Sequence, residues 1–167
     1  ERVRSQAARL KSVLTGLPTS IEVYYSLKAN ASLGLCDVLA DCGLGADVAS
    51  AGELATAVEA GFPPSRIFAA GPYKSAEMLE QLRSLPEAIV SVDSASELAI
   101  PGGEDLSNRA VLRLRPDFGS AALVAAGPHS PLGVPIHELP GCRDLLAGRG
   151  PEPRGCHRLA GPPLLAI

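Results

Sequence analysis

Three residues with chemically useful side chains lie at or next to the ends of short apolar runs: Lys28, Asp47 and Arg113. A lysine next to an apolar run can lose its charge through desolvation, and its neutral amine can then condense with an aldehyde. Asp47 would be a charged neighbour that orients or tunes this amine. Arg113 would suit a phosphate or phenolate oxygen. These residue types indicate an amine that bonds to a carbonyl compound.

Each of these residues also has a plain structural explanation. Lys28 follows the apolar run VYYSL and can extend from the strand end into solvent. Asp47 can be a turn carboxylate close to a helix. Arg113 alternates with Arg115, and one arginine of such a pair usually faces solvent. The residues alone leave both interpretations open.

The elements that must position these residues alternate regularly between strand and helix. Strands are expected over 21–27, 45–49, 66–70, 88–92 and 109–115, where apolar and β-branched residues are concentrated. Helical spacing of apolar residues covers 2–15 and 32–42. Further helices are expected after Ser50, Ser75 and Ser94. Ser50 with Glu53 and Ser94 with Glu97 read as capping boxes.

This alternation predicts parallel βαβ units, from either a doubly wound sheet or a (β/α) barrel. A dinucleotide-binding sheet would carry G-x-G-x-x-G after its first strand, where this chain has Lys-Ala-Asn-Ala-Ser. The barrel is therefore favoured. A complete barrel needs about 250 residues, so a partial α/β (β/α)8 barrel of about five units is expected. In such folds the chemistry gathers at the carboxyl ends of the strands.

Composition excludes several classes of protein. The chain has 167 residues, of which 46% are hydrophobic, and this fraction excludes a disordered tail. A net charge of −3 gives no reason to expect nucleic-acid binding. No apolar run approaches the ~18 residues that cross a bilayer, and no secretory signal is evident. The four cysteines have neither C-x-x-C nor zinc spacing, so we expect no metal site and free, buried thiols in the cytoplasm.

The composition changes after about residue 116. Eight of the fifteen prolines fall in 128–167, where one helix is expected at 138–147 and the remainder reads as loop. We therefore expect residues 1–147 to form a partial barrel domain and residues 148–167 to form a Pro/Gly-rich tail.

Six ordered segments resemble the N-terminal, alanine racemase-like barrel of the fold-type III pyridoxal-phosphate decarboxylases. They are YYSLKAN (24–30), GLGADVASAGELATAVEAG (43–61), RIFAAGPYKSAEML (66–79), AIVSVDSASEL (88–98), RAVLRLRPDF (109–118) and, more weakly, SPLGVPIHELP (130–140). Enzymes of this family act on diaminopimelate, ornithine, arginine and related basic amino acids. The resemblance implies pyridoxal 5'-phosphate as cofactor.

The resemblance also implies roles for individual residues. Lys28 matches the lysine that holds the cofactor as a Schiff base, and Asp47 matches a carboxylate close to it. Glu53 matches an acidic residue behind them in the next turn. Arg113 matches an arginine that reaches the cofactor's side of the pocket. His157, in GCHRLAGP (155–162), matches the first histidine of the family's Gly-x-His-x-His-x-Gly-Ser motif. It can equally be a loop histidine.

The sequence departs from the family in its last segment. Leu159 replaces a ring-stacking histidine, and Pro162 replaces a phosphate-contacting serine with a residue that offers neither hydroxyl nor N–H. GRGPEPR (148–154) should be a strand, which its two prolines oppose. The glycine-rich phosphate loop, the acidic partner of the pyridine nitrogen and the C-terminal β domain are not found. The chain therefore resembles a fragment of the family's enzymes.

The resemblance implies decarboxylation of a basic or diamino acid, such as diaminopimelate or ornithine, by a full-length and homodimeric relative. Weak or no turnover is expected of this chain itself. One alternative is a non-catalytic regulatory homologue that binds a protein partner, against which the retention of Lys28 argues. Another is an alanine racemase-like pyridoxal-phosphate protein, against which D-V-A-S-x-G-E-L followed by V-S-V-D-S argues. The substrate depends largely on residues beyond position 167.

Overall fold

The structure, a computed structural model, describes residues 1–98, 109–115, 130–147 and 154–158. The chain divides into two compact units, Glu1–Ile89 and Val90–Ile167. These are called the first unit and the second unit, and each is described by itself.

The first unit contains three parallel strands. β1 (Tyr24–Ser26) pairs with β2 (Gly45–Val48), and β2 pairs with β3 (Ile67–Ala69). The register aligns Ser26 with Asp47, so the carboxyl ends of β1 and β2 lie side by side. Gly45 faces the ring of Tyr24 so closely that a Cβ at this position would overlap it. Glycine at the start of β2 therefore allows the two strands to pair.

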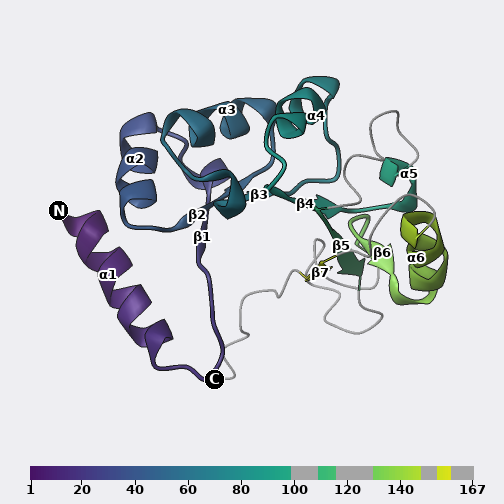
Figure 1. Ribbon diagram of the computed structural model, residues 1–167, viewed down its shortest axis with the longest axis horizontal. Helices are drawn as coiled ribbons and strands as arrows, with labels where there is room; N and C mark the ends of the chain where they lie inside the picture. The colour runs from purple at the N-terminus through teal and green to yellow at the C-terminus, as the bar shows by residue number, and fades with distance from the viewer. Residues whose placement is uncertain (99–108, 116–129, 148–153, 159–167) are drawn as a thin grey trace. The chain divides into compact units, whose positions relative to one another are not determined.

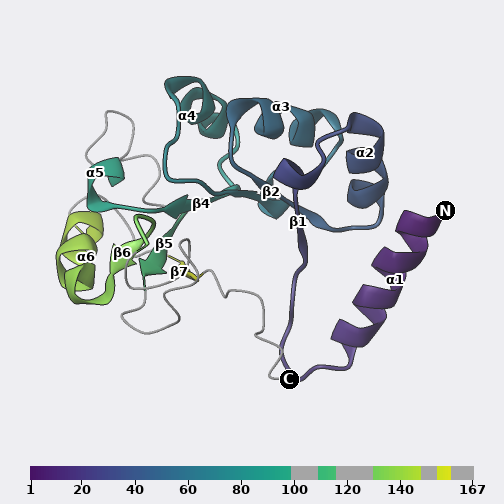
Figure 2. The same cartoon turned by 180° about the vertical axis from the view of Figure 1, so that it is seen from behind.

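Four α-helices belong to the first unit: α1 (Arg2–Thr15), α2 (Leu33–Asp41), α3 (Ala51–Glu59) and α4 (Ala76–Arg83). Figures 1 and 2 show α2, α3 and α4 in a row along the strands. Two short 3₁₀ turns, Leu27–Ala29 and Pro64–Arg66, follow β1 and precede β3. The strand-then-helix order predicted for this half of the chain is confirmed.

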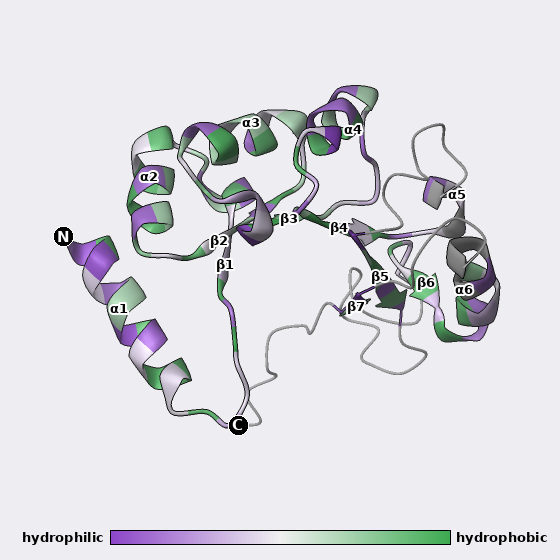
Figure 3. Cartoon of the chain, viewed as in Figure 1, coloured by the Kyte–Doolittle hydropathy of each residue, from purple (hydrophilic) through white to green (hydrophobic). Residues whose placement is uncertain are grey.

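Two of these helices begin at the serines that the sequence indicated. The Ser50 Oγ accepts the Glu53 N–H, and the Ser75 Oγ accepts the Met78 N–H, each at 3.2 Å. Both serines thereby satisfy a backbone donor that the first helical turn cannot. The apolar faces of α3 and α4 carry fully buried side chains, among them Leu54, Met78 and Leu82, and α3 contacts both α4 and β2. Figure 3 shows hydrophobic residues on these helices and along β3.

The described residues of the second unit form parallel strands and two α-helices. β5 (Ala110–Arg115) pairs with β4 (Ile89–Val92, whose first residue belongs to the first unit), with β6 (Val134–Pro135) and with β7 (Gly155–His157). α5 (Ala95–Leu98) and α6 (Leu139–Ala147) contact each other, and a 3₁₀ turn, Ile136–Glu138, precedes α6. The buried core of this unit comprises Val92, Ala110, Leu112, Val134 and Cys142.

Two expectations about strands are corrected. The strand expected over 21–27 is shorter: β1 begins at Tyr24, and residues 27–29 form the 3₁₀ turn. The region expected to be loop outside 138–147 contains β6 and β7. Both strands are very short and lack a β-branched run, so pairing with β5 rather than local sequence preference forms them. Most of GRGPEPR, together with Leu159 and Pro162, lies outside the described residues.

The cysteines only partly follow the expectation of buried thiols. All four are free; Cys36 and Cys142 are buried, Cys42 is half-buried and Cys156 is exposed. Cys156 lies on β7, a strand that was not predicted from the sequence. Among the described residues, no helix is long and apolar enough to span a membrane. The same residues contain no group of three or more side chains suited to holding a metal ion.

Candidate functional site

Lys28 lies in the 3₁₀ turn directly after β1. Its side chain is exposed, which corrects the expectation of a desolvated amine. The preceding residue, Leu27, is buried, so the chain turns at the strand end and carries Lys28 out of the apolar layer. Lys28 therefore stands at the carboxyl end of β1, as predicted, but in contact with solvent.

Asp47 lies on β2 beside Ser26, the residue two positions before Lys28. The residue is half-buried, but its Oδ1 atom is fully buried and finds no hydrogen-bond partner among the residues that the structure describes. A buried carboxylate oxygen without a donor is unfavourable, because it has lost water without gaining a replacement. Asp47 therefore offers an unused acceptor at the strand end next to Lys28.

The turn after β2 is held by Glu53. Its Oε2 accepts the Ala49 N–H at 2.8 Å, while the Glu53 N–H is bonded to Ser50. This arrangement resembles the predicted capping box, except that the glutamate reaches one residue further back than the N-cap. Glu53 thus fixes the backbone that leads from Asp47 into α3.

The loop after β3 approaches the same turn through Gly71. Gly71 has φ +117°, a conformation that other residues rarely adopt, and a Cβ there would lie 3.5 Å from the Ala49 carbonyl oxygen. The loops that follow β2 and β3 are therefore in contact at Ala49 and Gly71.

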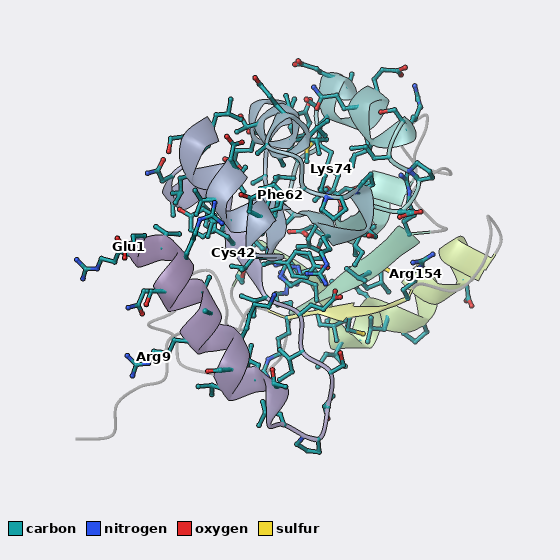
Figure 4. The ribbon with its side chains drawn as sticks, turned by 60° about the vertical axis from the view of Figure 1, so that its left-hand side comes forward. Glu1, Arg9, Cys42, Phe62, Lys74 and Arg154 are labelled. Atoms are coloured by element: carbon teal, nitrogen blue, oxygen red, sulfur yellow. The ribbon has the colours of Figure 1, made fainter. Side chains whose placement is uncertain are left out.

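Lys74 is the buried lysine of the first unit and was not among the site residues predicted from the sequence. It is 4% exposed, and its Nζ donates to the Gly71 carbonyl oxygen at 2.9 Å. Figure 4 labels it inside the unit, whereas Glu1 and Arg9 project from α1. The signal in the sequence was the position of G-P-Y-K at the carboxyl end of β3, where glycine and proline shape a loop.

In the second unit, Arg113 lies on β5 and is only 8% exposed. Its Nη1 donates to Asp93 Oδ2 at 2.9 Å, and Asp93 is itself 5% exposed. Arg115, the alternate arginine, is less buried and donates to the Ser130 carbonyl oxygen at 2.6 Å. The arginine that the resemblance selects is therefore the buried one, and a carboxylate already accepts one of its N–H groups.

His157 lies on β7 directly beside Arg113 in the strand register. Its Nδ1 is 2.8 Å from the Ser91 Oγ, and Ser91 in turn donates to Asp93 Oδ1 at 3.4 Å. The four residues Ser91, Asp93, Arg113 and His157 are called the Asp93 cluster below. Ser91 and Asp93 were not predicted as site residues, although S-V-D places two polar side chains on one face at the end of an apolar strand.

The turn between β4 and α5 matches the turn between β2 and α3. Glu97 Oε2 accepts the Asp93 N–H at 2.8 Å, as Glu53 accepts the Ala49 N–H. The expected Ser94 cap differs: the Ser94 and Ser96 hydroxyls are bonded to each other at 2.8 Å, and the Glu97 N–H donates to the Ser94 carbonyl oxygen. Glu97 thus fixes the backbone on which Asp93 stands.

Gly133 brings a second segment onto β5. It has φ +87°, and a Cβ there would lie 3.1 Å from the Arg113 carbonyl oxygen and 3.2 Å from its Cγ. Only a glycine lets the 130–133 segment approach the Arg113 backbone this closely. The expected site residues thus form two sets, Lys28 with Asp47 and Arg113 with His157, each at the carboxyl ends of parallel strands.

Comparison with known proteins agrees with this arrangement. Residues 1–130 match the family described as pyridoxal-dependent decarboxylase, pyridoxal binding domain. The chain is 33% identical to diaminopimelate decarboxylase of Methanothermobacter thermautotrophicus, over 98% of this chain and 39% of that protein. It is 36% identical to L-glutamyl-[BtrI acyl-carrier protein] decarboxylase of Niallia circulans, over 76% of this chain and 31% of that protein.

A solved structure shows the same fold. A single-residue variant of Helicobacter pylori diaminopimelate decarboxylase, complexed with L-lysine, superimposes with a TM-score of 0.75 at 26% identity. The match covers 92% of this chain and 40% of that one. The chain thus spans at most two fifths of the length of these relatives, and the expected partial (β/α) barrel is confirmed. Taken with the family match over 1–130, these findings show that the chain belongs to the pyridoxal-dependent decarboxylases, within their pyridoxal-binding domain.

Proposed function

We propose that the chain is the pyridoxal-phosphate-binding part of an amino-acid decarboxylase, with Lys28 as the residue that holds the cofactor. The observation that carries this proposal is the position of Lys28 and Asp47 at the carboxyl ends of adjacent strands in a pyridoxal-binding domain. An exposed amine can meet a carbonyl compound from solution without prior rearrangement. When bound, pyridoxal phosphate supplies an electron sink for breaking the bond to the α-carboxylate.

The unpartnered Asp47 Oδ1 supports the fit of this cofactor. A nitrogen that carries a proton beside this oxygen would give it the hydrogen bond that it lacks, and would be stabilised in its charged form. Lys28 carries such a nitrogen two residues after Ser26, the residue that is in register with Asp47. Asp47 is therefore assigned to hold a proton on the nitrogen that binds the carbonyl group.

Arg113 and His157 are proposed as further cofactor-binding residues, and Glu53 as the residue that fixes the Asp47 turn. A guanidinium has five N–H donors, so an arginine that gives one to Asp93 retains others for an anionic oxygen. The proposed substrate is a basic or diamino acid of the diaminopimelate class, bound by the whole enzyme as a homodimer. The four free cysteines support a cytoplasmic setting.

Trapping with a reducing agent tests the assignment of Lys28. The chain is incubated with pyridoxal phosphate and then with borohydride, and the pyridoxyl label is located by peptide mass spectrometry. The chain has only three lysines, Lys11, Lys28 and Lys74, so each candidate is read separately. The label is expected on Lys28, absent in Lys28→Arg and unchanged in Lys11→Arg. A label confined to Lys11 or Lys74, or no label, would overturn the proposal.

A cofactor-free regulatory homologue that binds a protein partner is the second candidate. The exposure of Lys28 is the observation that favours it, because an amine that holds a cofactor in a pocket is expected to be less open to solvent. The same trapping experiment separates the two functions, since a regulator without cofactor takes up no label. An alanine racemase-like protein is disfavoured, because the family match is to decarboxylases.

A further inference from the structure

Asp93, Arg113 and His157 stand in one row across three parallel strand ends. Arg113 is in register with His157, and the register of β4 with β5 aligns Val92 with Leu112, so that Asp93 follows beside Arg113. An acid, a guanidinium and an imidazole are therefore neighbours. Ser91, two residues before Asp93 on the same face of β4, is fully buried beneath them.

The direction of the hydrogen bonds follows from the charge on Asp93. Its Oδ2 accepts from the buried Arg113 guanidinium at 2.9 Å, and the two groups form a buried ion pair. An ionised carboxylate can only accept, so the single hydrogen of the Ser91 hydroxyl points to Asp93 Oδ1. The Ser91 oxygen is then an acceptor toward His157 Nδ1, 2.8 Å away.

We infer that Asp93 and Ser91 are positioning residues: Asp93 orients Arg113 directly and, through the Ser91 hydroxyl, holds neutral His157 in the Nδ1–H form. In this tautomer the lone pair of the ring lies on Nε2. The buried Asp93 carboxylate thereby orients both the Arg113 guanidinium and the proton-accepting Nε2 of His157, at the same strand ends. The inference depends on the proposed function in one respect only, the identity of the ligand that Arg113 and His157 contact, which is pyridoxal phosphate.

Nitrogen NMR of histidine tests the tautomer in the chain without cofactor. In the ¹⁵N-labelled chain at a pH where the rings are neutral, Nδ1 of His157 is expected to show the chemical shift of a protonated ring nitrogen. The signal is assigned by its loss in His157→Gln. His137, which is exposed, is the internal reference.

Three variants give the test its controls. Ser91→Ala removes the acceptor and is expected to shift His157 toward the Nε2–H tautomer, which free histidine prefers. Ser91→Thr keeps the hydroxyl and should restore the Nδ1–H signature. Ser96→Ala makes the same chemical change at an exposed position and should alter nothing. An Nε2–H form in the unmodified chain, or a Ser91→Ala signature equal to that of the unmodified chain, would overturn the inference.

Asp93→Asn tests the role of the carboxylate. If this variant does not fold, the Ser91 variants alone test the inference. Titration with pyridoxal phosphate, followed by absorbance, is the second readout, and Ser91→Ala is expected to weaken binding about tenfold while the label on Lys28 remains. A tautomer that responds as described, in a chain that takes up no cofactor, would refute the proposed function and leave the inference standing. If Lys28 is labelled by the cofactor but the His157 tautomer does not change in Ser91→Ala, the inference is refuted and the proposed function stands.

Discussion

The three lysines of this chain differ in how deeply they are buried, and the neighbouring residues in the sequence do not indicate which of them is buried. Lys74 is 4% exposed and bonded to the Gly71 carbonyl oxygen, whereas Lys28 and Lys11 are exposed. Lys28 follows an apolar run, which suggested burial, but the chain turns at Leu27 and releases it. Lys74 follows Gly-Pro-Tyr in the loop after β3, and this loop contacts Ala49, between β2 and α3, through Gly71.

Replacing Lys74 by methionine tests the structural role of the buried lysine. Lys74→Met keeps the length of the side chain but leaves the Gly71 carbonyl without its donor, so the free energy of unfolding should fall by about 1–3 kcal/mol. The matched variant Lys11→Met removes an exposed bond to the Cys42 carbonyl and should cost less. Urea unfolding followed by tyrosine fluorescence reports on this unit, because Tyr24, Tyr25 and Tyr73 all lie in it. Equal losses in the two variants would contradict the prediction.

The cysteines should react in the order of their exposure. Burial raises the pKa of the Cys36 and Cys142 thiols above the ordinary value of 9.0, so their reactive thiolates form only at higher pH. With excess disulfide reagent at pH 8, exposed Cys156 is expected to react first, and Cys36 and Cys142 only on unfolding. Mass spectrometry over time identifies the order. Cys156→Ser should abolish the fast phase, and a fast phase that persists would show the assignment to be wrong.

At the scale of elements, the chain uses the same turn twice to connect a strand to a helix. Ala-Ser-Ala-Gly-Glu-Leu (49–54) and Asp-Ser-Ala-Ser-Glu-Leu (93–98) each direct a glutamate back to the backbone N–H of the residue before the serine. The two bonds have the same length of 2.8 Å. The turn therefore sets where the strand stops and the helix starts, while the residue before the serine is free to vary between Ala49 and Asp93.

Removing the Glu53 carboxylate should weaken the first of these turns. Glu53→Ala loses the bond to the Ala49 N–H and a negative charge at the start of α3, which together stabilise by about 1 kcal/mol. Glu53→Gln retains an acceptor oxygen and should lose less. Glu59→Ala, an exposed glutamate at the other end of α3, is the matched control. Thermal unfolding compares the variants, and a control that loses as much as Glu53→Ala would refute this role.

The order of strands and helices could be predicted from sequence, because each helix of the first unit has its own periodicity and two begin at a capping serine. The short strands β6 and β7 could not be predicted, because they depend on pairing with β5 rather than on their own residues. The site residues on strand ends followed from motifs. Their surroundings did not: the burial of Asp47 Oδ1 and of Lys74 depends on how the unit packs, and the Asp93 cluster joins Ser91 to His157, 66 residues away.

At the scale of the whole molecule, binding of a cofactor should be visible as added stability. A ligand that binds only the folded chain stabilises it by about 2.7 kcal/mol at one hundred times its Kd. Saturating pyridoxal phosphate is therefore expected to raise the thermal midpoint by several degrees, and Lys28→Arg should remove most of this shift. Pyridoxine, which has no aldehyde, is the ligand control. A shift that is equal with pyridoxine, or that survives in Lys28→Arg, would exclude a lysine-held cofactor.

The exposure of Lys28 has a consequence that does not depend on any enzyme activity. An amine that is open to water at the end of β1 is equally open to reducing sugars, whose aldehyde groups condense with amines slowly and without catalysis, with loss of water. Lys74, enclosed beside Gly71, is protected from the same attack. Prolonged storage in glucose should therefore glycate the chain at Lys28 and leave Lys74 unmodified.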